Sequence, residues 1–313
     1  MIQKRSIGIV GTGHVGVAAA YAIFLRGLCS EIVLIDKDGR RAEGEAMDLM
    51  HGQAFAERVT ARAGNYEDLA DAQLVVISAG VAQKEGETRL DLLNRNAEVF
   101  RDIIGQLDRH APQAVLVIAT NPVDILTLVS QTLSRRAGSR IIGTGTMLDT
   151  ARFRALLGQH YNVDPRSVHA YIVGEHGDSE VPLWSSARIG GVPLVDQPIP
   201  GRPFVKEEMD ALFERVRNAA YDIISRKGYT NTAIGSAIAR LVEAVLEDQG
   251  SVLPVGRLLE GHYDIAEVCL SIPTIVDSSG VREALLPRLN EEERRGLHRS
   301  ADILKESLRQ LGI

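Results

Sequence analysis

Short aliphatic runs and helical patterns alternate regularly in the first half of the chain. Continuous apolar strands separated by helices are typical of a parallel sheet that is buried on both faces. The sequence therefore predicts an α/β protein with a doubly wound parallel sheet. The expected strands are Ser6–Val10, Glu31–Ile35, Leu74–Ser78 and Ala114–Ala119, and the expected helices are His14–Gly27, Arg40–Gly52, Arg89–His110 and Val123–Ser134.

The pattern changes after Ile141 and Ile142. A helix, a strand, a hairpin at Gly190-Gly191, two long helices, a meander and a closing amphipathic helix are expected there. We therefore predict two domains, residues 1–145 and a mixed α+β domain over 146–313, which share an interface because the connection is short. The helices are expected at Leu148–His160, Lys206–Arg226, Asn231–Asp248 and Asn290–Leu311. The strand is expected at Val168–Val173 and the meander at Ser251–Val276.

Composition narrows the class of protein. Of 313 residues, 45% are hydrophobic but only 4% aromatic, so the core must consist mainly of Val, Leu, Ile and Ala. A net charge of −6 without a long basic run argues against a nucleic-acid surface. No apolar run is long enough to span a membrane. Cys29 and Cys269 lie far apart without metal-ligand neighbours, so we expect no metal site and a reduced, cytoplasmic protein.

A nucleotide-binding signature opens the chain. Gly11-Thr12-Gly13-His14-Val15-Gly16 follows the first strand and begins the first helix. Its glycines allow a tight turn, close approach of a pyrophosphate and close helix–strand packing. Asp36 ends the second expected strand, where a carboxylate binds both adenosine ribose hydroxyls and repels a 2′-phosphate, which favours NAD over NADP. The alternative is a glycine turn with a helix-capping aspartate.

His176 is the candidate acid/base, within Gly174-Glu175-His176-Gly177-Asp178. The pKa of a histidine lies near neutrality, and a buried carboxylate can hold the ring in one tautomer. Asp149 is the candidate for that carboxylate. It lies on one helix face with Arg152, so the alternative is an ordinary intrahelical salt bridge. In the functional interpretation the pair is split: Asp149 reaches His176, and Arg152 binds a substrate carboxylate.

Two further segments follow expected strands. The polar loop from Gly80 to Arg89 leaves a carboxyl end, where doubly wound sheets bind ligands, so it can close over a substrate while Arg89 polarises a carbonyl. Alternatively, Arg89 is a solvated residue at a helix start. Asn121 can bind a nicotinamide ribose or a substrate hydroxyl, or it caps the helix that follows Pro122.

In order and spacing, these motifs resemble the L-lactate/L-malate dehydrogenase family over nearly the whole chain. Lys227-Gly228-Tyr229-Thr230 matches as well. The resemblance implies that NAD is the cofactor, that His176 and Asp149 form the proton-transfer pair, and that Arg152 grips the substrate carboxylate. It implies that Arg89 stabilises the developing alkoxide. The other residues that it implies at the site are Asn121 and Thr230 at the substrate, and Gly11, Gly13, Val15, Gly16, Asp36, Gly80, Asn121 and Ile234 at the cofactor.

Gln83 discriminates between substrates in this resemblance. Family members that act on oxaloacetate carry an arginine there, whereas glutamine is the choice of those that act on lactate. An uncharged side chain cannot neutralise a second buried carboxylate. We therefore expect reversible reduction of pyruvate to L-lactate. Departures at Val81-Ala82 and Asn231-Thr232 keep malate-type and 2-hydroxyisocaproate-type alternatives open.

Two alternatives come from other classes: an NAD-dependent glycosidase, which needs a Cys/His metal site, and a catalytically silent nucleotide-binding protein. The resemblance also implies binding of fructose 1,6-bisphosphate by Arg154 and His169 at a subunit two-fold axis, unless both are retained structurally. It further implies a homotetramer, for which the sparsely charged stretches Gly11–Leu25 and Tyr229–Val245 are candidate contacts.

Overall fold

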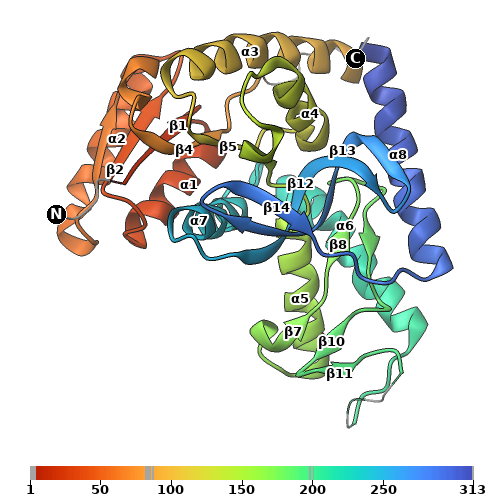
Figure 1. The fold of residues 1–313 in the computed structure, drawn as a ribbon. Coiled ribbons are helices and arrows are strands. Elements are labelled where there is room, and N and C mark those ends of the chain that lie inside the picture. Colours follow the sequence, from red (N-terminus) through yellow and green to blue (C-terminus); the bar gives the residue numbers. More distant parts are fainter. Residues whose placement is uncertain (1–4, 82–85, 87, 197–198, 200, 312–313) are drawn as a thin grey trace.

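A computed structural model describes residues 5–81, 86, 88–196, 199 and 201–311. Its largest element is a nine-stranded sheet with strand order β14-β13-β12-β6-β5-β4-β1-β2-β3 (Figure 1). The first six strands pair in parallel. They are β1 (Ser6–Val10), β2 (Glu31–Ile35), β3 (Thr60–Ala63), β4 (Ala72–Ile77), β5 (Val115–Ile118) and β6 (Ile141–Gly143).

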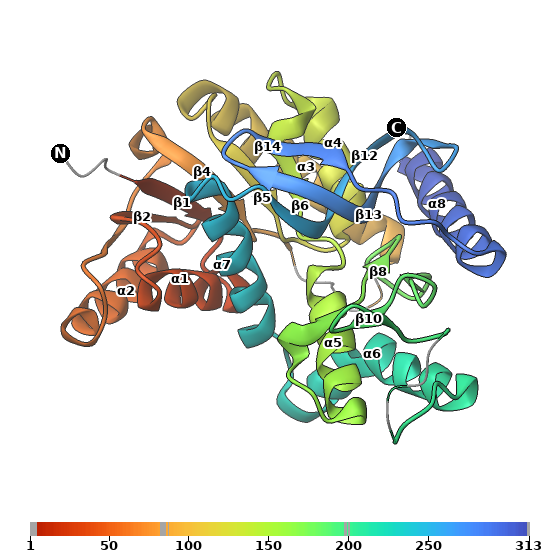
Figure 2. The same ribbon diagram turned by 60° about the horizontal axis from the view of Figure 1, so that its bottom comes forward.

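Helices cover both faces of this sheet, as the predicted doubly wound architecture requires. On one face, Ile7 and Ile9 of β1 share a core with Ile23 of α1, while Val10 packs on the other face in the core that holds Phe100 of α3. Figure 2 shows the two helix layers. The first layer consists of α1 (His14–Leu25), α2 (Gly39–His51) and α7 (Thr232–Leu246), and the second of α3 (Arg89–His110), α4 (Val123–Leu133) and α8 (Glu291–Leu311).

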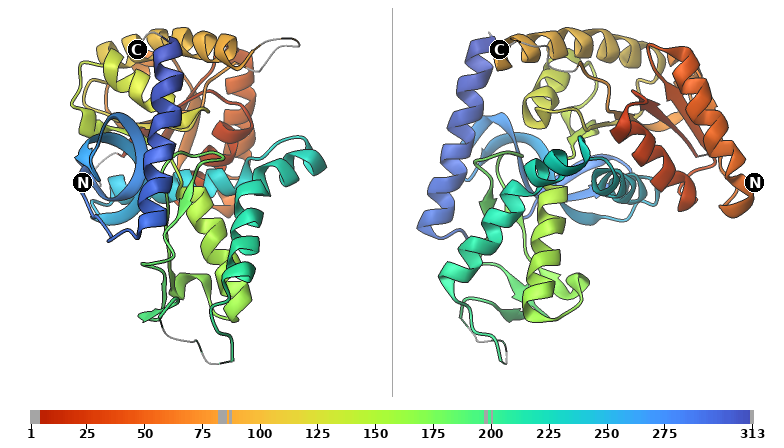
Figure 3. Two further views of the ribbon diagram at one scale, coloured as in Figure 1. Left: turned by 90° about the vertical axis from the view of Figure 1, so that its right-hand side faces the viewer. Right: turned by 180° about the vertical axis from the view of Figure 1, so that it is seen from behind.

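A separate core lies around two further helices, α5 (Met147–Tyr161) and α6 (Lys206–Lys227), which pack side by side away from the large sheet (Figure 3). Phe153 and Met209 are fully buried in it. Small sheets complete this part, and the expected hairpin at Gly190-Gly191 is confirmed, with φ of 55° and 85°. Their strands are β7 (Val168–His169), β8 (Ile172–Val173), β9 (Val181–Pro182), β10 (Arg188–Ile189) and β11 (Val192–Pro193).

The expectation of one continuous strand over 168–173 was wrong. β7 pairs with β10, whereas β8 pairs with β9, so the chain changes sheets at Ala170 and Tyr171. Side chains of α5 form hydrogen bonds with main-chain groups on either side of the break. Arg154 Nε donates to Ala170 O at 2.8 Å, and Ile172 N donates to Thr150 Oγ1 at 2.9 Å. Because side chains of α5 occupy these main-chain groups, the hydrogen bonds between strands do not continue from β7 to β8.

The expected meander is an antiparallel extension of the parallel sheet. It consists of β12 (Ser251–His262), β13 (Ile265–Asp277) and β14 (Gly280–Ala284), and β12 joins β6 through the pair Gly256 and Gly143. A Cβ on Gly143 would lie 2.6 Å from Thr127 Oγ1, so glycine permits this close junction. One sheet thus runs through both predicted domains, and β3 and β14 were not anticipated.

Short 3-10 turns connect several elements, at Gln53–Phe55, Tyr66–Leu69, Gly138–Arg140 and Pro165–Ser167. No helix within the described ranges is long and apolar enough to cross a membrane.

Candidate active site

The loop between β1 and α1 has the geometry that its three glycines predict. Gly11 has a φ of 99°, a backbone conformation that residues with a side chain rarely adopt. A Cβ on Gly16 would lie 1.9 Å from Gly11 O. A Cβ on Gly13, in contrast, would have no described atom within 4 Å. The turn is therefore tight at Gly11, packed at Gly16 and open at Gly13, where a phosphate can approach the main chain.

The amino end of α1 completes this loop. Gly13 is the N-cap residue, its helix carries no acid in the first turn, and no side chain of the described residues caps it. Free N–H groups and the positive end of the helix dipole therefore face the loop. An anionic pyrophosphate fits this position.

Asp36 lies at the carboxyl end of β2 beside the same loop. Its carboxylate accepts hydrogen bonds from Thr12 N at 2.7 Å, Thr12 Oγ1 at 2.9 Å and Asp38 N at 3.0 Å. Burial opposes ionisation, but these bonds hold the pKa of Asp36 below its ordinary value. Asp38, not Asp36, caps α2, so the helix-capping alternative for Asp36 was wrong.

The carboxyl ends of β4 and β5 lie at the same edge of the sheet. Ser78 Oγ donates to Gly11 O at 2.9 Å, and Thr120 Oγ1 donates to Ala79 O at 2.7 Å. A Cβ on Gly80 would lie 2.7 Å from the Thr120 methyl. Asn121 is exposed here, and α4 is capped at Pro122 without a side-chain bond, which is against the N-cap alternative for Asn121.

His176 and Asp149 meet at the centre of this edge. Their Nδ1 and Oδ2 atoms are 2.5 Å apart, although the two residues come from the segment after β8 and from α5. The Asp149 side chain is 4% exposed and that of His176 is 26% exposed. The histidine is thus held by a buried carboxylate and still reaches the surface of the site, so it is no freely solvated loop residue.

Arg152 completes the cluster and corrects one expectation. Its Nη1 donates to Asp149 Oδ1 at 2.9 Å, while Asp149 Oδ2 faces His176. From the sequence, the Asp149–Arg152 salt bridge and the Asp149–His176 contact were expected as alternatives. In the structure Asp149 makes both contacts. The Arg152 side chain is 14% exposed, and it shares the Asp149 carboxylate with His176.

Electrostatics favour a charged histidine. Burial lowers the pKa of His176, but Asp149, Asp124 and Glu180 together raise it to about 9. Burial would raise the pKa of Asp149, yet His176 and Arg152 hold it below its ordinary value. A protonated ring held in this way can donate a proton to a nearby oxygen.

Two of these acids were missed in the sequence. Asp124 Oδ2 accepts the main-chain N–H of His176 at 2.8 Å, and burial raises the pKa of Asp124 to about 7. Burial, followed by the charge on Asp149, raises the pKa of Glu180 to about 8. In the sequence, Asp124 has the pattern of a helix first-turn acid and Glu180 that of a loop residue, so no local signal distinguishes them.

Thr230, in the segment before α7, and Ile234, in the first turn of α7, lie toward the glycine loop. The Tyr229 ring stacks on His14 with centroids 3.9 Å apart, and α7 crosses α1 where Gly235 meets Ala18. Ile234 packs against the same core as Val15.

The substrate loop is described only in part. Gln83 lies outside the described residues, as does the side chain of Arg89. The main chain of Arg89 begins α3, after a capping box in which Thr88 and Asp91 exchange hydrogen bonds.

Arg154 of α5 bonds the main chain next to His169, which lies on β7. Arg154 bonds Ala170 O, which follows His169, and its guanidinium lies 4.9 Å from the centre of the Tyr171 ring. His169 is exposed on β7, opposite Arg188 on β10.

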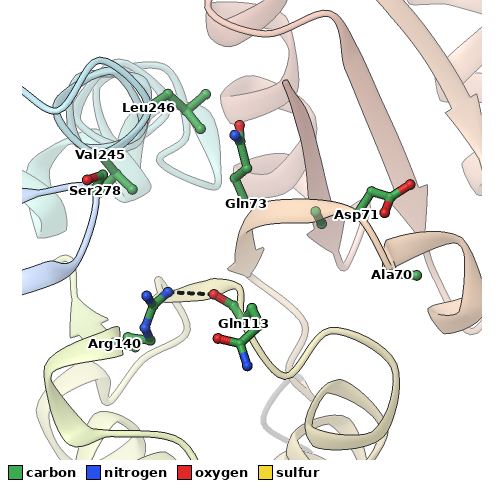
Figure 4. Close-up of a pocket in the computed structure, with 9 residues that line it drawn as sticks. Ala70, Asp71, Gln73, Gln113, Arg140, Val245, Leu246 and Ser278 are labelled. Atoms are coloured by element: carbon green, nitrogen blue, oxygen red, sulfur yellow. Dashed lines mark hydrogen bonds between the residues drawn. The ribbon is translucent and has the colours of Figure 1, made fainter. Parts of the chain in front are cut away.

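A well-defined pocket lies at the opposite edge of the sheet, where the parallel strands begin. Figure 4 shows Gln73, Gln113 and Arg140 around it, with Arg140 Nη1 bonded to Gln113 O at 2.5 Å, and its volume is about 290 Å³. It contains none of the clustered residues above. Among the residues that the structure describes, no group of His, Cys, Asp or Glu is arranged to hold a metal ion, and Cys29 and Cys269 are buried free thiols.

Comparison with known proteins identifies the family. Residues 5–143 match the model of the lactate/malate dehydrogenase NAD binding domain, and residues 146–311 match that of the lactate/malate dehydrogenase alpha/beta C-terminal domain. The chain belongs to the lactate/malate dehydrogenase family. The glycine loop and Asp36 accordingly lie in the NAD-binding domain of this family.

Individual relatives within the lactate/malate dehydrogenase family are similar over their full length. The chain is 59% identical over 314 residues to an L-lactate dehydrogenase of Salinibacter ruber. The alignment covers 100% of this chain and 99% of that protein. It is 51% identical to an L-lactate dehydrogenase of Thermus aquaticus over 98% of this chain and 99% of that protein. The structure of a minor L-lactate dehydrogenase from Enterococcus mundtii in a ligands-bound form superposes with a TM-score of 0.95, at 43% identity over 98% of both chains.

Proposed function

We propose that this protein is an NAD-dependent L-lactate dehydrogenase that interconverts pyruvate and L-lactate. The observation that carries the proposal is the Asp149–His176 pair with Arg152 beside it, at the sheet edge that also holds the glycine loop. The similarity to L-lactate dehydrogenases over whole chains supports it. NAD in its reduced form, when bound, supplies the hydride for C2 of pyruvate.

His176 is the proton donor in the direction of pyruvate reduction. With its pKa raised to about 9, the ring is charged at neutral pH and delivers its proton to the substrate carbonyl oxygen. Asp149 keeps Nδ1 engaged, so that Nε2 is the nitrogen directed at the substrate, and it stabilises the charged ring. In lactate oxidation the neutral ring accepts the same proton.

Arg152 and Arg89 bind the substrate in this proposal. Arg152 pairs with the carboxylate, because a planar guanidinium matches its two oxygens. Arg89, at the end of the polar loop, stabilises the negative charge that develops on the substrate oxygen. Asn121 borders both the substrate and the nicotinamide, Thr230 borders the substrate, and Ile234 packs on the nicotinamide face.

The cofactor site fits NAD. The open main chain at Gly13 and the free N–H groups of α1 receive the pyrophosphate, and Val15 and Gly80 border the dinucleotide. The ionised Asp36 accepts hydrogen bonds from the adenosine ribose and disfavours a 2′-phosphate.

Gln83 determines the substrate in this proposal, and an assay of NADH oxidation tests it. Wild-type enzyme should prefer pyruvate to oxaloacetate by at least about 100-fold in kcat/KM, because an unpaired buried carboxylate costs roughly 3–5 kcal/mol. Gln83→Arg should shift this ratio toward oxaloacetate. Equal or reversed preference in the wild type would instead favour malate or a broader set of 2-oxo acids, including 2-hydroxyisocaproate-type substrates.

The division of the chain and its effector are further parts of the proposal. We assign residues 1–145 to cofactor binding and 146–313 to catalysis, a division supported by the two family models, which meet at residues 144–145. Arg154 and His169 form a phosphate site for fructose 1,6-bisphosphate. Activity measured with and without this ester, in wild type and in Arg154→Ala, tests the effector.

A homotetramer in the cytoplasm is the proposed assembly. The apolar side chains of Tyr21 and Leu25 on α1 are 55% and 45% exposed, next to a hollow of about 630 Å³ that also reaches α7. A second subunit covering this face would remove that apolar area from water. Light scattering should give about four times the chain mass of 34.0 kDa.

A further inference from the structure

Asp124 connects two parts of the molecule that approach the site from different sides. It lies in the first turn of α4, in the cofactor-binding part, and is 3% exposed. Its Oδ2 accepts the main-chain N–H of His176 at 2.8 Å, from the segment that follows β8. Its Oδ1 is buried and has no hydrogen-bond partner among the described residues.

Packing alone does not account for this carboxylate. A single main-chain N–H needs one acceptor oxygen, which a neutral Asn or Ser also supplies, whereas a buried carboxylate carries a desolvation cost of several kcal/mol. The part of the molecule around Oδ1 is the junction of the two sheet halves, where a Cβ on Gly256 would lie 3.5 Å away. Above its pKa of about 7, this carboxylate places a negative charge beside His176, which a packing role does not require.

The charged groups around Asp124 show where that charge acts. His176 is the group that favours its ionisation, through the hydrogen bond and through its own charge. The acids that face it are Glu175, on the same segment as His176, and Asp149, on α5. The charge of Asp124 also acts on Cys269 of β13, while Arg152 and Glu180 interact electrostatically with Asp149.

We propose that Asp124 is a positioning residue for proton transfer: it anchors the main chain of His176 so that the ring faces Asp149, and its charge favours the protonated ring. This inference rests on the proposed function, because it requires His176 to be the proton donor. It goes beyond the His176–Asp149 pair, since the anchor comes from the opposite part of the molecule.

The position of Asp124 also couples the histidine to the cofactor edge. Asn121, which borders the nicotinamide in the proposed function, lies three residues before Asp124 and precedes Pro122, the N-cap residue of α4. The first turn of α4 therefore fixes both the Asn121 edge and the main chain of His176. A displacement of this turn would move the proton donor relative to the cofactor.

Asp124→Asn separates the charge from the anchor. The amide oxygen still accepts the N–H of His176, but the negative charge is lost, so the pKa of His176 should fall. The alkaline limb of kcat/KM for pyruvate and the acid limb for lactate should therefore both move to lower pH, by about one unit. A residue with only a structural role would lower the melting temperature and leave both limbs in place.

Asp277→Asn is the matched control. Asp277 is 8% exposed and also accepts a main-chain N–H, from Ser279 at 2.9 Å, but it lies at the end of β13 outside the site. Its variant should keep the wild-type pH limbs. Equal shifts in both variants, or no shift in Asp124→Asn, would overturn the role of the Asp124 charge.

Asp124→Ala tests the anchor, because it removes the acceptor as well. We expect its kcat/KM to lie about 100-fold below that of Asp124→Asn, as for a misplaced catalytic group. Equal values for the two variants would contradict the anchoring role. If Asp124→Asn does not fold, Asp124→Ser carries the same expectation for the pH limbs, since it keeps an acceptor without a charge.

The wild-type assay separates the two levels of the proposal. Failure of wild-type enzyme to oxidise NADH with pyruvate would overturn the proposed function, and this inference with it. An active wild type combined with unmoved limbs in Asp124→Asn would overturn this inference alone.

Discussion

The two carboxylate oxygens of Asp149 bind two different partners, and this division organises the site at the scale of residues. Oδ2 faces His176 and Oδ1 accepts from Arg152. Because one buried carboxylate positions both the proton donor and the substrate-binding cation, removing its charge should affect proton transfer and binding together.

Asp149→Asn gives the first prediction, a shift of the pH profile. His176 donates a proton only below its pKa, so kcat/KM for pyruvate in the wild type should stay level to about pH 9 and then fall. Loss of the Asp149 charge lowers that pKa, so the limb should move to lower pH, and the rate at pH 7 should fall by about 100-fold or more. Steady-state kinetics from pH 5 to pH 10 would show it, and an unmoved limb would exclude His176 as the titrating donor.

Arg152→Lys gives the second prediction, a loss of substrate binding. A lysine keeps the positive charge but cannot pair with both carboxylate oxygens, so KM for pyruvate should rise by at least about 10-fold. Arg166→Lys is the control, because Arg166 also pairs with an aspartate but is 91% exposed and outside the site. Unchanged KM in Arg152→Lys would place the substrate carboxylate elsewhere.

At the scale of elements, the crossing of α1 and α7 fixes how the Thr230 segment meets the glycine loop. Gly235 of α7 lies against α1 so closely that a Cβ would stand 2.7 Å from the Ala18 main chain. The contact between these helices therefore depends on the absence of one side chain, and the stacking of Tyr229 on His14 follows from it.

Gly235→Ala should destabilise the protein by about 1–3 kcal/mol, because the added methyl has no room against main-chain atoms. Gly44→Ala is a matched test in α2, where a Cβ would meet no described atom within 4 Å. There, the better helix propensity of alanine should add about 0.5–1 kcal/mol. Urea unfolding measures the change in the free energy of unfolding of each variant, which should be negative for Gly235→Ala and positive for Gly44→Ala. A Gly235→Ala variant of unchanged stability would show that the two helices can move apart.

At the scale of the whole molecule, one sheet passes through both family domains. The pair of Gly143 and Gly256 joins β6 to β12, and β13 packs against α4 and α8. The two parts should therefore unfold together, because the cores on both faces of the sheet contain side chains from either part.

Calorimetry with NADH tests this coupling. NADH binds the first part of the chain, and at a concentration one hundred times its Kd it should stabilise the folded state by about 2.7 kcal/mol. We expect a single transition that moves to higher temperature as a whole. Two transitions, of which only one moves, would mean that the shared sheet does not couple the domains.

Local patterns in the sequence were sufficient for the elements near the cofactor. The glycine loop, Asp36 and most helices of the first half follow from residues adjacent in the chain, and β1, β2 and α3 have the expected bounds. The same holds for the Gly190-Gly191 hairpin. By contrast, the strand expected over 168–173 failed because its hydrogen bonds are decided by Arg154 and Thr150, on another element.

Apolar periodicity and turn residues act within a few positions, so they were enough to predict the parallel sheet with helices on both faces. The sequence also singled out His176, Asp149 and Arg152, but not how Asp149 serves both partners. Two features became visible only in the folded molecule: the sharing of one sheet by two domains, and the convergence of Asp124 and Glu180 on the histidine. These features depend on contacts between residues distant in sequence, and the pKa of each buried acid is set by the neighbours that folding brings to it.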